Sequence, residues 1–84
     1  MRYTLDILRS AQKRLAQIAH RDQKRIIEAI YSLAENPRPL GCKKLSGRSA
    51  WRIRVGTYRV IYEVHDDRLV ILVVAIAHRK EVYR

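Results

Sequence analysis

The chain has 84 residues, of which 18 are lysine or arginine and 8 are acidic, so its formal net charge is +10. This length fits one domain, residues 1–84, and leaves no room for a second. Hydrophobic residues make up 48% of the sequence, too many for a disordered basic tail, and the excess positive charge favours an anionic partner.

Cysteine, histidine and the apolar runs exclude further classes. Cys42 has no second cysteine to pair with, so we expect a reducing compartment and no disulfide scaffold. The three scattered histidines show none of the common zinc spacings, and we expect neither a metal nor a cofactor. The longest apolar run, Leu69 to Ala77, is far shorter than the roughly 20 residues that cross a bilayer. Since the N-terminus lacks the pattern of a signal peptide, we predict a soluble cytoplasmic domain.

The first quarter of the chain predicts a strand followed by a helix. Polar and apolar residues alternate from Arg2 to Ile7, as in a half-buried strand. From Leu8 to Ala19 the apolar residues recur every three or four positions, which is typical of an amphipathic helix. Ser10 is a candidate N-cap of this helix, and His20 suits its last turn.

A second helix and a loop come next. The helix is predicted to run from its candidate cap, Asp22, to Asn36–Pro37, where the proline stops it. The short connection between the two helices predicts an antiparallel hairpin. Residues 37–47 contain two prolines and two glycines, and they predict an irregular basic loop.

The second half of the chain predicts three strands. The apolar residues of segment 51–55 share one face of a strand, and Arg52 and Arg54 share the other. Residues 58–65 alternate in the same way, and residues 69–76 are apolar on both faces, as in a central strand. The predicted order is therefore β-α-α-β-β-β. We expect an α+β fold in which the helical hairpin packs on one face of a small antiparallel sheet and the arginines occupy the other face.

The positive charge is concentrated in one segment. No acidic residue occurs between Glu35 and Glu63, and this segment holds seven basic residues: Arg38, Lys43, Lys44, Arg48, Arg52, Arg54 and Arg59. A single sign of charge favours a phosphate-binding surface; the alternative is a generally basic, solvated surface. Arg52 and Arg54 lie about 7 Å apart on one strand, and Arg59 can come alongside from the next. Three guanidiniums so placed suit bidentate contact with phosphate.

The polar tail could complete a reactive site. His78, Arg79 and Tyr83 follow the last predicted strand and could lie beside the arginines. Metal-free cleavage of RNA needs a base for the 2′-OH, an acid for the 5′ oxygen, and cations for the charge on the phosphorane. Nearby cations would favour the phenolate form of Tyr83. The alternatives are that Tyr83 is a packing residue and that His78 is a hydrogen-bonded histidine at the end of a sheet.

Four segments together resemble one known family. They are Leu45–Arg48, Trp51–Gly56, Tyr58–Glu63 and His78–Tyr83. Their order and spacing make the chain similar to the RelE/ParE superfamily of toxins from type II toxin–antitoxin systems, nearest the RelE branch. The resemblance covers essentially the whole chain and implies the RelE-like microbial ribonuclease fold.

The same resemblance implies an activity and its residues. RelE-type toxins are endoribonucleases that cleave mRNA in the ribosomal A site without metal, and so inhibit translation. Arg52, Arg54 and Arg59 would hold the scissile phosphate and stabilise its charge. Arg79 would contact the transition state and protonate the leaving group, and Tyr83 would be the base for the 2′-OH.

Two positions depart from the family pattern. Positions 52 and 54 are often lysine in the family, whereas both are arginine here. Arginine keeps its proton, so neither residue can act as a base. That role passes to Tyr83 or to His78, because histidine titrates near neutral pH and some relatives use one.

The resemblance also implies partners. An acidic antitoxin would cover the basic face in a hetero-oligomeric complex. The ribosomal RNA backbone would be contacted by further basic residues: Arg38, Lys43, Lys44, Arg48 and Lys80. The alternative function is a ParE-like inhibitor of DNA gyrase without hydrolytic activity, which would share the fold. A third hypothesis, a non-catalytic nucleic-acid-binding module, accounts for the charge but not for the polar tail.

Overall fold

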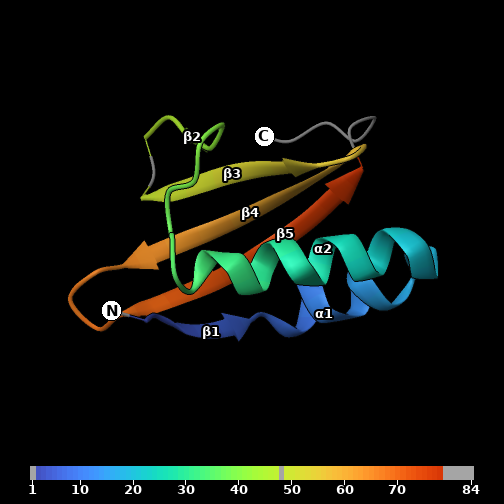
Figure 1. Ribbon diagram of the computed structural model, residues 1–84, viewed down its shortest axis with the longest axis horizontal. Coiled ribbons are helices and arrows are strands. Elements are labelled where there is room, and N and C mark those ends of the chain that lie inside the picture. Colours follow the sequence, from blue (N-terminus) through green and yellow to red (C-terminus); the bar gives the residue numbers. More distant parts are fainter. Residues whose placement is uncertain (1, 48, 79–84) are drawn as a thin grey trace.

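The computed structural model describes residues 2–47 and 49–78. The elements follow in the order β1 (Thr4–Ile7), α1 (Arg9–Ala16), α2 (His20–Leu33), β2 (Lys43–Lys44), β3 (Ala50–Val55), β4 (Tyr58–His65) and β5 (Val70–His78) (Figure 1). Two helices thus separate the first strand from the other four. None of the helices in these two stretches is long and apolar enough to cross a membrane.

The five strands form one sheet in the order β1-β5-β4-β3-β2 (Figure 1). Neighbouring strands from β2 to β5 are antiparallel, whereas β1 pairs with β5 in parallel. The α+β prediction is confirmed, with the correction that the sheet is mixed. The difference arises because no tight turn joins β1 to its neighbour. A strand connected through two helices can return in the parallel direction.

Strand β2 lies in the segment that was predicted to be an irregular loop. Its two residues pair with β3, Lys43 opposite Arg52 and Lys44 opposite Trp51. Two lysines give no alternating pattern, so the sequence does not signal a strand here. The pairing arises because the outer edge of β3 presents backbone groups that need partners, and lysines are typical of a short, exposed edge strand.

The helices begin and end at different residues from those predicted. Helix α1 starts after Leu8, so Ser10 lies inside it and is not its N-cap. The helix ends at Ala16, and His20 opens α2 instead of closing α1. Asp22 then lies in the first turn of α2, where its negative charge suits the helix dipole.

A buried residue and a side-chain hydrogen bond explain the break between the helices. Ile18, in the short connection, is buried in the core. The side-chain amide of Gln23 donates to the backbone oxygen of Leu15 at 3.0 Å, satisfying a carbonyl in the last turn of α1. Helix α1 therefore ends three residues before Ala19, and α2 begins two residues before Asp22.

One hydrophobic core lies between the helices and a single face of the sheet. Its buried members are Ala11, Ile18, Ile26, Ile30 and Leu33 from the helical segment, and Ile53, Val60, Tyr62, Ile71, Val73 and Ile76 from the strands. Trp51 packs against this core, as its alternation with Ile53 predicts. Tyr62 is fully buried, and its hydroxyl donates to the backbone oxygen of Pro37 at 2.7 Å. This bond fixes the start of the loop that follows α2.

A polar clamp joins three segments that are distant in sequence. The Arg38 guanidinium donates to both carboxylate oxygens of Asp66, at 2.9 and 3.4 Å, and the Tyr3 hydroxyl donates to the same carboxylate at 2.6 Å. The guanidinium carbon of Arg38 also lies 5.1 Å from the centre of the Trp51 ring, within range of a cation–π contact. The clamp holds the loop after α2 against the turn between β4 and β5.

Candidate functional site: a basic face of the sheet

Four cationic side chains share the face of the sheet that is turned away from the core. Arg54 pairs directly with Arg59 across β3 and β4, and Lys43 pairs with Arg52 across β2 and β3. Direct cross-strand partners project on the same face, as do residues two apart on one strand. We call this face the open face and these four residues the basic cluster. The sequence predicted the three arginines together, and the structure adds Lys43.

The basic cluster repels itself electrostatically. Arg54 and Arg59 are opposite each other, at a Cα separation of about 5 Å for such a pair. Burial lowers the pKa of Arg52, and the positive charges of Arg54 and Arg59 lower it further. Within residues 2–47 and 49–78, no carboxylate forms an ion pair with any of the four. An anion placed among them would relieve this repulsion.

Two guanidinium nitrogens of the cluster are buried without a partner. The Nε atoms of Arg52 and Arg59 are shielded from solvent, and no described residue accepts a hydrogen bond from them. A buried N–H donor without an acceptor is unfavourable, by about 1–3 kcal/mol for a typical polar group. Phosphate oxygens are the acceptors that arginine binds in a bidentate manner. The arrangement therefore favours an oxyanion ligand.

Short and apolar side chains form the floor beside the cluster. Arg59 is opposite Ala77 on β5, and Ile61, only 2% exposed, is opposite Ala75. Ala77 is also buried, so the small apolar side chains beside Arg59 are covered and not open to solvent. No group of three or more metal-binding side chains occurs in the described part of the chain.

A bulge in β5 decides which side chains face the cluster. Ile61 pairs with Ala75 and the next residue, Tyr62, pairs with Val73, so Val74 is an extra residue without a partner. One extra residue reverses the alternation beyond it. Ala75 and Ala77 consequently lie on the open face, and His78 takes the opposite side.

The predicted tail residues are only partly described. His78 pairs with Tyr58, and the two rings meet edge to face with their centres 5.2 Å apart. This places His78 on the face of the helices, away from the arginines. Arg79, Lys80 and Tyr83 lie outside the described residues, as does Arg48.

The remaining predicted RNA contacts lie on the side of the helices. Arg38 is engaged in the clamp with Asp66 and Trp51, and its hydrogen bond to Asp66 raises the pKa of its guanidinium. Lys44 pairs with Trp51 and therefore projects away from the open face, although it is exposed. The structure thus separates Lys44 and Arg38 from the basic cluster.

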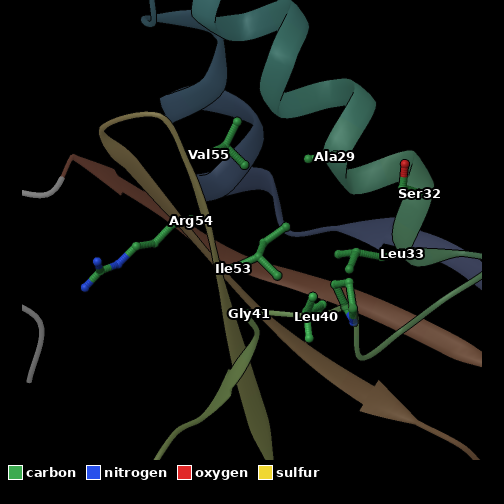
Figure 2. Close-up of a pocket in the computed structure, with 9 residues that line it drawn as sticks. Ala29, Ser32, Leu33, Leu40, Gly41, Ile53, Arg54 and Val55 are labelled. Carbon is green, nitrogen blue, oxygen red and sulfur yellow. The ribbon is translucent and has the colours of Figure 1, made fainter.

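An apolar groove, which the sequence did not indicate, lies between α2 and β3. It has a volume of about 410 Å³ and lies among Ala29, Ser32 and Leu33 of α2, the loop 39–41, and residues 53–55 of β3. Figure 2 shows Arg54 extending away from this groove while Ile53 and Val55 point toward α2. Leu40 at its rim is 105% exposed. The only feature of the sequence that could have indicated this groove is Leu40, which stands between a proline and a glycine.

Comparison with known proteins shows one consistent relationship. Residues 5–83 match the model of a family described as the ParE toxin of the type II toxin–antitoxin system parDE. The whole chain is 27% identical to the toxin RelG of Mycobacterium tuberculosis and covers 99% of that protein.

Solved structures of similar proteins share the fold. The chain matches the archaeal RelE–RelB complex from Pyrococcus horikoshii with a TM-score of 0.86 and 28% identity, over 98% of this chain and 100% of the other. It matches the RelB–RelE antitoxin–toxin complex from Methanococcus jannaschii with a TM-score of 0.70 and 30% identity, over 89% and 91% of the two chains. The similarity therefore includes the helices and the sheet that carries the basic cluster.

Proposed function

The chain belongs to the RelE/ParE family of type II toxin–antitoxin toxins, and from this premise we propose that it is a metal-independent endoribonuclease that cleaves mRNA in the ribosomal A site. The observation that carries the proposal is the basic cluster, in which Arg52, Arg54 and Arg59 lack acidic partners among the described residues. A scissile phosphate supplies the missing acceptors.

The proposed reaction is an internal transfer at phosphorus. The 2′ oxygen of the ribose forms a bond to phosphorus while the bond from phosphorus to the 5′ oxygen breaks. A base takes the 2′-OH proton, and an acid gives a proton to the departing 5′ oxygen. The products are a 2′,3′-cyclic phosphate and a 5′-OH. The extra negative charge develops on the equatorial oxygens, where forked guanidiniums stabilise it more strongly than in the ground state.

Tyr83 is our proposed base, and Arg79 the proposed proton donor for the leaving group. Strand β5 reaches His78 at the end of the sheet that bears the cluster, since Ala77 is opposite Arg59. His78 takes the helix side, away from the cluster. Cations nearby favour a tyrosine phenolate. This placement of His78 favours Tyr83 over it.

The partners follow from the charge. We propose that phosphates of the ribosome and mRNA contact Lys43, Lys44, Arg48 and Lys80 in the cytoplasm, and that a cognate acidic antitoxin neutralises the toxin in a hetero-oligomeric complex. The similar chains from Pyrococcus horikoshii and Methanococcus jannaschii were both solved in complex with RelB. An acidic partner also relieves the self-repulsion of the basic cluster.

Arg59→Ala tests the function. We expect programmed ribosomes to show mRNA cleavage by the wild-type protein, mapped at the ends of the fragments, and a rate about 100-fold lower for the variant, because one oxyanion donor is lost. Arg68→Ala is the matched control. It removes one positive charge from the exposed turn between β4 and β5 and should leave the rate unchanged.

The tail is tested in the same assay. Tyr83→Phe should strongly reduce cleavage, and His78→Ala should reduce it much less. If Tyr83→Phe cleaved mRNA at the wild-type rate and His78→Ala did not cleave it, the base would be His78 and not Tyr83. Intact mRNA together with gyrase-dependent DNA damage in cells would instead establish the ParE-like alternative, to which the name of the matched family also points.

A further inference from the structure

A polar pair lies on the open face at the opposite end of β4 from the basic cluster. Glu63 and His65 are two residues apart on this strand, and His65 Nε2 lies 2.9 Å from Glu63 Oε1. Both side chains are 31% exposed. The pair shares the face of Arg59, because residues 59, 61, 63 and 65 alternate with the core residues of β4. Any RNA strand that follows β4 from the cluster reaches this pair.

The register surrounds Glu63 with apolar neighbours. Glu63 is opposite Ala50 on β3 and opposite Leu72 on β5. Ala50 is buried, and Leu72 is half-buried. Because Ala50 is covered, the half-buried Leu72 is the apolar surface on which a base can lie beside the carboxylate. The imidazole of His65 fixes the orientation of the carboxylate.

Glu63 has capacity for one more donor. Its hydrogen bond to His65 uses Oε1, and no other residue in the described part of the chain binds this carboxylate. A carboxylate repels phosphate, so Glu63 is not a contact for the RNA backbone. It accepts hydrogen bonds from N–H groups, and nucleobases present such groups as exocyclic amines.

The spacing suits a nucleotide close to the cut. Glu63 lies four residues beyond Arg59, on the order of 13 Å along the strand. A dinucleotide with unstacked bases spans such a length. A single, partly exposed polar pair contributes little to stability, so the position of this pair on the proposed RNA-binding face is its more informative property.

We propose that Glu63, oriented by His65, recognises the exocyclic amino group of a nucleobase within two nucleotides of the scissile phosphate. This inference rests on the proposed ribonuclease function, and it adds a specificity subsite to the basic cluster. Adenine, cytosine and guanine carry such an amino group, whereas uracil carries none. The protein itself, and not only the ribosome, then selects the cut.

The test removes the amino group of a base from the mRNA and the carboxylate of Glu63 from the protein. Ribosomes are programmed with mRNAs in which one adenosine near the cut is replaced, position by position, by purine riboside, which lacks only the amino group. Cleavage rates are measured for the wild-type protein, Glu63→Ala and Glu63→Gln. Asp67→Ala is the control, because it removes one negative charge from the exposed turn outside the open face.

At one position we expect the wild-type protein to cut the adenosine mRNA about tenfold faster than the purine riboside mRNA. This ratio should fall to about one for Glu63→Ala and be unchanged for Asp67→Ala. It should be partly retained for Glu63→Gln, because the amide oxygen of glutamine still accepts a hydrogen bond. An equal ratio in wild type and Glu63→Ala overturns the inference while leaving the proposed function intact, as does a parallel loss of rate on both mRNAs. Absence of wild-type cleavage overturns the proposed function itself.

Discussion

At Arg52, the requirements of folding stability and of the proposed phosphate binding conflict most directly. Its Nε is buried without a described acceptor, and the charges of Arg54 and Arg59 lower its pKa. Its aliphatic stem projects on the same face as the buried Ile61, directly opposite on β4. The stem can therefore pack beside Ile61 while the guanidinium remains available to bind a ligand.

Arg52→Met separates these two parts of the side chain. The variant retains the packing stem and loses the charge and the buried donor, so we expect it to unfold at a higher urea concentration, with a gain of about 0.5 kcal/mol from relieved repulsion. Cleavage should fall at the same time. Arg68→Met is the control in the exposed turn and should change neither property. A lower urea midpoint for Arg52→Met would show that the cluster is not strained.

Among the elements, the loop after α2 depends on contacts that no local pattern encodes. Tyr62 binds the oxygen of Pro37 from the core side, and burial raises the pKa of this tyrosine. Arg38 binds Asp66 from the outer side. The loop leads into β2, and β2 brings Lys43 beside Arg52. The clamp therefore contributes to the geometry of the basic cluster from the other side of the sheet.

The clamp predicts a dependence of stability on pH. The hydrogen bond from Arg38 holds the pKa of Asp66 below its ordinary value of about 3.9, with a further contribution from Tyr3. Stabilisation from such a group is complete above the pKa of the unfolded state and disappears as the pH falls through the lower folded-state pKa. Urea midpoints of the wild-type protein should therefore fall below about pH 4.

Asp66→Asn should already be less stable at neutral pH and should lose less on acidification. Asp67→Asn removes the neighbouring exposed carboxylate and should follow the wild-type curve. If the Asp66 and Asp67 variants gave the same acid dependence, the clamp would not be the source of the pH effect.

The whole molecule has a net charge of +10, and the charged residues of the open face are unevenly distributed along it. The basic cluster occupies one end, and Glu63 with His65 occupies the other. Under the proposed function, phosphates would bind at the first end and base edges would be read at the second. This arrangement gives an RNA strand a direction on the sheet, which a uniformly basic surface does not provide.

Ribosome binding should depend strongly on salt. Each cation that contacts a phosphate steepens the plot of log affinity against log salt concentration, by about 0.7–0.9. Lys43→Ala should reduce this slope by about that amount, whereas Lys24→Ala, an exposed lysine on α2, should leave it unchanged. Equal slopes for the two variants would contradict the placement of Lys43 on the RNA-binding face.

The sequence by itself determined the features that depend on local periodicity. Alternation of period two placed Arg52, Arg54 and Arg59 on one face, and the spacing of apolar residues gave two helices that cover the other face. These features are local because side-chain direction follows from the backbone repeat alone. The family resemblance, carried by segments such as Trp51–Gly56, was likewise present in the sequence.

Only the tertiary structure decided the features that depend on pairing. The parallel position of β1 and the pairing of Lys43 with Arg52 depend on hydrogen bonds between distant segments. The bulge at Val74 turned His78 toward Tyr58, because one unpaired residue reverses every side chain beyond it. The same register aligned Glu63 with Ala50 and Leu72 on the face of the arginines. No local pattern specifies such a register, since it depends on which strands meet and where.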